Sequence, residues 1–179
     1  MFARFHVILL HLYQRLPTRA RRRVVRTISP SFTVGAMCFI ERDDGALLLV
    51  RHAYRRHWGV PGGLLKRGED AADGARREVL EEVGLAVDLL GEPTVVVDPA
   101  PQRVDVVYRA RPTTGSDPTA AVPRSPEITE ARWFRRGQLP ELQHETAGAL
   151  VKLSRAQHAE HAPPVERTDQ RSANRSTTA

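Results

Sequence analysis

A glycine-rich loop that leads into a short acidic helix is the feature that most constrains this chain. Residues 63–85 read GLLKRGEDAADGARREVLEEVGL, with apolar residues at the spacing of one buried helix face. Glu78, Glu81 and Glu82 stand at positions i, i+3 and i+4, so they share a neighbouring face. Like charges at this spacing cost an isolated helix roughly 0.2–0.5 kcal/mol per pair. A bound cation would offset that cost, and a solvated acidic face is the alternative.

The spacing of the whole segment is more specific than an acidic helix. The segment resembles the Nudix box, Gly-x5-Glu-x7-Arg-Glu-(apolar)-x-Glu-Glu-x-Gly-(apolar), and the preceding WGVPGG resembles the usual lead-in of that family. The fixed positions of the box are all filled, by Gly63, Glu69, Arg77, Glu78, Val79, Glu81, Glu82, Gly84 and Leu85. The resemblance implies an α/β fold, an α/β/α sandwich with a mixed β-sheet, and a hydrolase of phosphoric anhydride bonds.

The carboxylates of the box predict a metal site. Oxygen ligands on a rigid helix, with neither cysteine nor histidine among them, suit Mg²⁺ or Mn²⁺ rather than zinc. Such an ion would neutralise phosphate oxygens and lower the pKa of the attacking water. The predicted ligands are Glu78, Glu81, Glu82 and, as the resemblance implies, the carbonyl group of Gly63.

The resemblance also implies a wider set of catalytic residues. We expect this set to comprise Glu78, Glu82, Glu69, Arg77 and Glu127. The general base stays open among the glutamates, because members of the family differ in this respect. Arg77 is expected to orient the glutamates by ion pairing, and Glu69 to act in the outer sphere of the metal. Glu127 is preferred to Glu130 as the further acidic ligand or base that many relatives carry before the last strand.

Substrate recognition is expected in the loops around the box. The predicted contact residues are Arg51, Tyr54, Trp58 and Tyr108, and packing beneath the Pro-Gly-Gly turn is the alternative role for Trp58. Pro101 lies about sixteen residues beyond the box, as in relatives acting on ADP-ribose, and the alternative is that Pro101 serves only the turn that it forms with Pro99. A nucleoside diphosphate linked to a group X is therefore the favoured substrate. Clearance of oxidised nucleoside triphosphates is the second hypothesis, and a catalytically silent nucleotide sensor is the third.

The remaining pattern predicts one catalytic domain, residues 30–156. Strands are expected at 32–40, 46–50, 86–97, 104–111 and 127–134, with residues 43–45 as a hairpin turn between the first two. A closing helix over 145–155 and a disordered tail over 157–179 complete the chain. The single cysteine, Cys38, lies in an apolar run, which favours a buried structural thiol and a cytoplasmic location.

The positive charge is concentrated in an N-terminal arm, residues 1–29. The first 30 residues hold seven arginines and no acidic residue, whereas the rest of the chain carries 20 basic and 21 acidic residues. Apolar residues recur at helical spacing before Pro17, in a run too short to span a bilayer. We expect a basic amphipathic helix packed on the domain or on a second subunit of a homodimer. Peripheral membrane contact is the alternative, and nucleic-acid binding is disfavoured.

Overall fold

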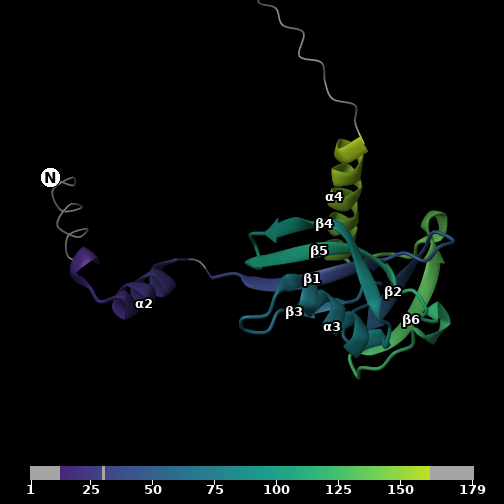
Figure 1. Cartoon of the computed structure of the whole chain (residues 1–179), viewed down its shortest axis with the longest axis horizontal. Helices are drawn as coiled ribbons and strands as arrows, with labels where there is room; N and C mark the ends of the chain where they lie inside the picture. Colours follow the sequence, from purple (N-terminus) through teal and green to yellow (C-terminus); the bar gives the residue numbers. More distant parts are fainter. Residues whose placement is uncertain (1–12, 30, 162–179) are drawn as a thin grey trace, which may run out of the picture.

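The computed structural model describes residues 13–29 and 31–161 (Figure 1). Its strands are β1 (Thr33–Ile40), β2 (Ala46–His52), β3 (Gly62–Leu64), β4 (Val87–Asp98), β5 (Arg103–Pro112) and β6 (Ile128–Arg135). Its helices are α2 (Thr18–Ile28), α3 (Ala71–Val83) and α4 (His144–His161), with 3₁₀ turns at Pro118–Ala120 and Arg136–Gln138. The five expected strands and the closing helix are present. The short strand β3 is additional, and α4 continues through residues 157–161, which the sequence assigned to the tail.

Four strands form a mixed sheet in the order β3-β1-β5-β4. β1 and β5 run parallel, with Thr33 opposite Arg103 and Ile40 opposite Ala110. The outer strands β3 and β4 are antiparallel to their neighbours. β2 and β6 pair antiparallel in a separate two-stranded sheet. The expected mixed sheet is confirmed.

The turn at residues 43–45 does not make the expected hairpin. Gly45 has a φ of +78° and its N–H donates to the carbonyl of Arg42, so the chain does reverse there. β1 and β2 nevertheless belong to different sheets, and a bridge between Glu41 and Leu47 links their ends. The hairpin is wrong because both edges of β1 are already occupied, one by β3 and the other by β5.

Both ends of α3 are capped by residues of the box segment. Asp70 accepts a hydrogen bond from the N–H of Ala72 at 2.8 Å, which satisfies one free donor of the first turn. Gly84 adopts a left-handed φ of +70° and donates its N–H to the carbonyl of Leu80. The caps define the helix that carries the three glutamates.

Alternation along β1 places α3 and α4 on opposite faces of the mixed sheet. Cys38 lies in one buried cluster with Val79 of α3, and Phe39 lies in another with Leu153 of α4. The expected sandwich of helix, sheet and helix is therefore confirmed. Cys38 is fully buried, and burial raises the pKa of its thiol to about 12, so the residue is a protonated packing group.

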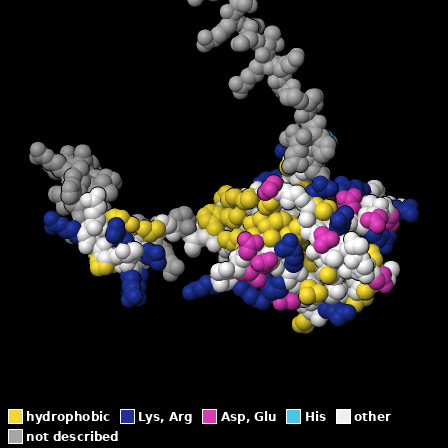
Figure 2. Space-filling view, in the orientation of Figure 1, with side chains coloured by type: hydrophobic (Ala, Val, Ile, Leu, Met, Phe, Trp, Pro, Cys, Tyr) yellow, Lys and Arg dark blue, Asp and Glu magenta, His cyan; other side chains and the backbone are white. Residues whose placement is uncertain are grey.

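The arginine-bearing helix α2 lies apart from the sheets (Figure 1). Figure 2 shows an apolar area over the ends of the mixed sheet that lie nearest α2. Val34, Val95 and Val97 are exposed, and the strand register places Val34 of β1 and Val97 of β4 opposite the same residue of β5, Val104. Within the described residues, no helix has both the length and the hydropathy needed to cross a bilayer. The apolar stripe expected over residues 1–12 and the tail from residue 162 onward lie outside the described residues.

Candidate active site

A pocket of about 430 Å³ lies where seven segments of the chain converge. Its polar lining residues are His52 at the end of β2 with Tyr54 and Arg55 after it, Glu78 and Glu82 on α3, Arg103 on β5, Glu127 before β6, and Gln143, Glu145 and Thr146 at the start of α4. The backbone of the Pro-Gly-Gly turn and three apolar side chains complete the wall. Two of the three predicted glutamate ligands are thus brought together with the predicted loop carboxylate.

Glu82 is a buried carboxylate, with 5% of the residue exposed. Its Oε2 accepts a hydrogen bond from the N–H of Gly62 at 3.1 Å, and its Oε1 lies 3.5 Å from Nε2 of His52. Burial raises the pKa of Glu82, and the contacts with His52 and Gly62 oppose that rise. Desolvation therefore disfavours the charged form, and a cation in the pocket would favour it.

Glycines bring the backbone close to the glutamates and to β1. A Cβ on Gly62 would collide with the carbonyl oxygen of Ala36. A Cβ on Gly63 would lie between 2.6 and 2.8 Å from the carboxylate atoms of Glu78. A side chain at Gly62 would therefore clash with the backbone of β1, and one at Gly63 would displace the carboxylate of Glu78. With glycine at both positions, bare peptide faces the pocket beside Glu78.

Arg77 connects the glutamates of the box. Its Nε and Nη2 donate to Glu69 at 2.6 and 2.9 Å, and its Nη1 donates to Glu78 at 2.7 Å and to Glu81 at 3.0 Å. The hydrogen bonds from Arg77, with a further one from the Lys66 N–H, lower the pKa of Glu69 from 4.5 to about 2. The same contacts, led by Glu69, raise the pKa of Arg77. One guanidinium thus holds the carboxylates of Glu69, Glu78 and Glu81, as we expect of an arginine that orients the glutamates.

Glu81 does not line the pocket. Its side chain is 53% exposed and lies between Arg77 and the Nζ of Lys66, which is 3.5 Å away. Glu81 therefore shares the helix with Glu78 and Glu82 but points to a different side.

The oxygen atoms around the pocket suit a hard divalent cation. Glu78, Glu82 and the peptide of Gly63 offer carboxylate and carbonyl ligands of the kind that Mg²⁺ and Mn²⁺ prefer. In the described part of the chain, no three His, Cys, Asp or Glu side chains already converge as a metal cluster. The reason is that Glu78 is hydrogen-bonded to Arg77, Glu82 to Gly62, and Glu81 faces Lys66.

The two carboxylates near β6 have different surroundings. Glu127 is exposed and lines the pocket, and its carbonyl accepts the N–H of Ala53 at 2.8 Å. Glu130 is held by Arg51 and Arg132, each at 2.6 Å, and is absent from the pocket wall. The preference for Glu127 over Glu130 thus agrees with their positions.

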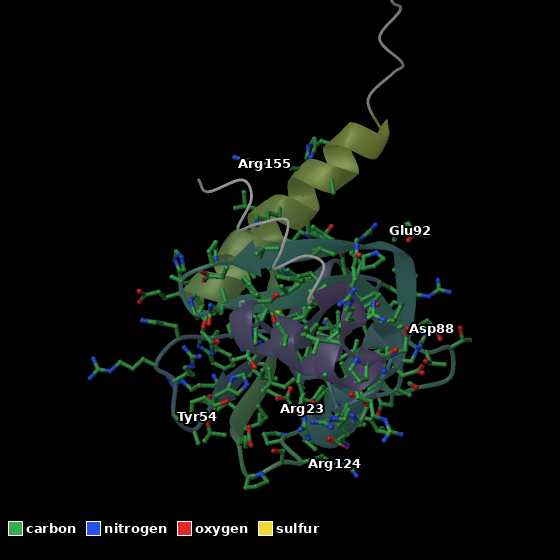
Figure 3. The ribbon with its side chains drawn as sticks, turned by 90° about the vertical axis from the view of Figure 1, so that its left-hand side faces the viewer. Arg23, Tyr54, Asp88, Glu92, Arg124 and Arg155 are labelled. Carbon is green, nitrogen blue, oxygen red and sulfur yellow. The ribbon has the colours of Figure 1, made fainter. Side chains whose placement is uncertain are left out.

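Of the four predicted substrate contacts, Tyr54 alone lines the pocket. It is 66% exposed and lies at the periphery of the domain on the β2–β3 connection (Figure 3). Trp58 is only 9% exposed, and its ring packs edge-on against Phe134 at 4.9 Å between centroids. Arg51 pairs with Glu130, and Tyr108 is 7% exposed inside the core. These positions favour the packing role for Trp58.

Several pocket residues carry no sequence signal that singled them out. His52 is buried, and its Nδ1 lies 3.4 Å from Nε2 of Gln143, which in turn donates to the carbonyl of His57. Arg55 reaches from the β2–β3 connection to Glu145 on α4, with Nη1 and Oε1 3.1 Å apart. Arg103 is paired with Asp105 two residues along β5. An aspartate within a predicted strand, two positions after an arginine, is the sequence pattern that could have indicated the pair of Arg103 and Asp105.

Comparison with known proteins identifies the family to which these features belong. The model of the NUDIX domain matches residues 31–154. A MutT-like protein of Streptomyces ambofaciens is 31% identical over 130 residues, covering 73% of this chain and 77% of the relative. Human 8-oxo-dGDP phosphatase NUDT18 is 32% identical and NAD-capped RNA hydrolase NudC of Shigella flexneri 33% identical. The match covers 69% and 70% of this chain but only 36% and 46% of those two proteins.

Solved structures agree with the sequence comparison. A NUDIX hydrolase from Nitrosomonas europaea superposes with a TM-score of 0.60 at 25% identity, covering 73% of this chain and 74% of that one. A MutT NUDIX hydrolase from Burkholderia pseudomallei gives a TM-score of 0.56 at 29% identity, covering 69% and 99%. A UDP-X diphosphatase shares the fold at 18% identity, with a TM-score of 0.60 and coverage of 82% and 74%.

Proposed function

The chain belongs to the Nudix hydrolase family, whose members act on pyrophosphate bonds, and we propose that it hydrolyses a nucleoside diphosphate linked to a second group X with Mg²⁺ or Mn²⁺ as cofactor. The observation that carries the proposal is the convergence of Glu78, Glu82 and Glu127, three of the four carboxylates that line one pocket; the fourth, Glu145, is paired with Arg55. The bare peptide of the Pro-Gly-Gly turn lies beside them, so a diphosphate and its cation can approach closely.

Each carboxylate has a role in this proposal. When bound, the divalent ion would neutralise the charge of the phosphate oxygens and lower the pKa of a water molecule bound to it. Glu78, Glu82 and the Gly63 carbonyl are the residues that we assign to hold it, and Arg77 keeps Glu78 oriented. We prefer Glu127 as general base, because Glu78 and Glu82 are already engaged by Arg77 and Gly62.

Two features of the chain bear on the nature of group X. Pro101 stands in the turn before β5, at the spacing seen in relatives that act on ADP-ribose, and this favours an ADP-ribose-like substrate. The exposed ring of Tyr54 at the pocket could stack on a base, a contact worth roughly 1–3 kcal/mol in nucleic-acid binding.

Hydrolysis of oxidised nucleotides is the second candidate function. A mouse protein named as an oxidized purine nucleoside triphosphate hydrolase is 34% identical over 87 residues, and NUDT18 is named for 8-oxo-dGDP. A silent nucleotide sensor is the third candidate, and the complete set of box glutamates opposes it. We further propose that the domain acts in the cytoplasm, with the arm serving assembly or attachment to a membrane surface and not catalysis.

A substrate panel with metal control tests the proposal. The purified chain is incubated with ADP-ribose, UDP-glucose, 8-oxo-dGTP and dGTP in Mg²⁺, in Mn²⁺ and in EDTA, and the products are separated by chromatography. The proposal expects nucleoside monophosphate and the phosphate of X from a diphosphate-linked substrate, with loss of turnover in EDTA. Faster turnover of 8-oxo-dGTP favours the second candidate. Binding of a compound without turnover of any compound favours the third candidate, the silent nucleotide sensor. Undiminished turnover in EDTA overturns the metal assignment.

A further inference from the structure

Arg103 enters the pocket as a cation fixed by a buried acid. Its Nε donates to both oxygens of Asp105, at 2.9 and 2.8 Å, and its Nη2 lies 2.8 Å from Oδ1. Asp105 is 5% exposed, and residues two apart on a strand share a face, so the pair is built into β5. A guanidinium held through one edge by a buried carboxylate has a defined direction, unlike a flexible surface arginine.

The absence of a side chain at Gly35 makes room for this pair. A Cβ on Gly35 would lie 2.5 Å from Oδ1 of Asp105 and 3.0 Å from Nη2 of Arg103. The carbonyl oxygen of Gly63 is also 3.0 Å from that same point. Nη2 of Arg103 and the carbonyl oxygen of Gly63 therefore both lie beside the same point next to Gly35. Gly63 also approaches the carboxylate of Glu78, and Gly63, Glu78 and Arg103 all line the pocket.

The charges of the pocket are unevenly distributed around this peptide. Glu78, Glu82, Glu127 and Glu145 are acidic lining residues, and Arg103 lines the same space. Within the described residues, Nη1 of Arg103 has no hydrogen-bond partner, because Asp105 takes only the Nε and Nη2 side. Arg55, the other lining arginine, is 46% exposed and is paired with Glu145. Arg103 is accordingly the better-fixed cation of the two.

We propose that Arg103 binds the second phosphate of a diphosphate substrate, the one that departs when water attacks its neighbour; this assignment rests on the proposed hydrolase function. In that reaction, the water oxygen bonds to the attacked phosphorus and its proton passes to a pocket carboxylate. The bond from that phosphorus to the bridging oxygen breaks, and the electron pair stays on the oxygen. The departing phosphate therefore gains negative charge, and donors of a guanidinium offset that charge best where they are already oriented.

Three variants test the assignment by steady-state kinetics on the best substrate of the panel. Arg103→Gln removes the charge, Arg103→Lys keeps the charge but loses the fork, and Arg111→Gln removes an exposed arginine from the opposite end of the same strand. A hydrogen bond to a charged group is worth enough to lower kcat/KM roughly 10- to 100-fold in Arg103→Gln, with partial recovery in Arg103→Lys. Arg111→Gln should match wild type. A folded Arg103→Gln protein with wild-type kcat and KM overturns the proposal.

A binding measurement separates this assignment from the hydrolase function. Inorganic pyrophosphate is titrated calorimetrically into each protein at one fixed Mg²⁺ concentration, so that the cation contributes equally to every titration. Wild type and Arg111→Gln should bind it, and Arg103→Gln should bind at least about 10-fold more weakly. Equal binding by Arg103→Gln and wild type overturns the phosphate subsite even if the enzyme is active. A further outcome is that wild type hydrolyses nothing in the panel and still binds pyrophosphate. If Arg103→Gln then loses that binding, the hydrolase function fails and the phosphate subsite stands.

Discussion

Arg77 and Glu69 are joined through two nitrogens of one guanidinium, with Nε and Oε1 2.6 Å apart and Nη2 and Oε2 2.9 Å apart. Glu69 Oε2 also accepts the N–H of Lys66 at 2.7 Å. The pair therefore fastens the loop between β3 and α3 to the helix that bears the pocket glutamates. A bidentate contact of this kind fixes orientation as well as distance.

The pair predicts a specific dependence of stability on pH. The pKa of Glu69 is lowered from 4.5 to about 2 in the fold. A depressed pKa means that the contribution to the free energy of unfolding is complete above pH 4.5 and is lost as the pH falls towards 2. We expect Glu69→Gln to melt below wild type at pH 6 to 7, with a difference that shrinks between pH 4.5 and 2. Thermal unfolding in EDTA across this range measures it.

An exposed pair on the same helix provides the control. Arg76 and Asp73 lie 3.4 Å apart with Asp73 75% exposed, and such pairs contribute little. Asp73→Asn should follow wild type at every pH. A difference for Glu69→Gln that persists undiminished at the acid end would show that lost packing, not the ion pair, is responsible.

Glu82→Gln should separate catalysis from stability. The buried charge is costly to the fold, because burial raises the pKa of Glu82. We therefore expect the melting temperature of Glu82→Gln in EDTA at pH 7 to 8 to equal or exceed that of wild type. The excess should disappear at lower pH, where wild-type Glu82 becomes protonated. Turnover should fall by roughly 100-fold or more, because a proposed cation ligand is lost. Wild-type turnover would make Glu82 a structural residue only.

Tyr54 and Trp58, two aromatic residues on one connection, should behave differently on substitution. Tyr54→Ala should raise KM several-fold and leave the melting temperature unchanged, because the ring is exposed at the pocket. Trp58→Ala should lower the free energy of unfolding by about 3–5 kcal/mol, as expected for a buried tryptophan. Chemical denaturation and steady-state kinetics distinguish these effects. A stable Trp58→Ala protein with a raised KM would restore Trp58 to the substrate site.

The sequence predicted which glutamates of α3 line the pocket better than it predicted the rest of the lining. Glu78 and Glu82 could be found because their spacing along one helix decides which side chains share a face. The direction of Glu81 could not, because it depends on the competing cations Arg77 and Lys66. The helix-sheet-helix sandwich followed from the resemblance to the Nudix box, with which the order of the expected elements agrees. The hairpin between β1 and β2 failed because strand pairing depends on which edges other strands occupy.

The residues that sequence analysis missed act through long-range contacts. His52 meets Glu82 across 30 positions of the chain, and Arg55 meets Glu145 across 90. No periodicity or local motif encodes such distances. Arg103 is a local exception, since Asp105 lies two residues away, but the space at Gly35 that admits the pair comes from a parallel neighbouring strand.

The N-terminal arm is expected to be dispensable for catalysis. Deletion of residues 1–28 removes seven arginines and α2, and no residue described in that segment, 13–28, lines the pocket. We expect kcat/KM on the best substrate to stay within about twofold of the full chain, because no transition-state contact is removed.

Assembly or surface attachment should change instead. The arm precedes β1, which carries the exposed Val34 near its start, and Val95 and Val97 are exposed on β4 of the same sheet. Removal of the arm therefore changes which segments, of this chain or of a second copy, can pack on these valines. Light scattering of both proteins tests self-association, and sedimentation with vesicles containing anionic lipid tests attachment through the arginines. A matched variant with Arg21, Arg22 and Arg23 changed to Gln keeps the length of the arm but removes part of its charge. A truncated protein that is folded yet inactive would place the arm in the active site and contradict this division of roles.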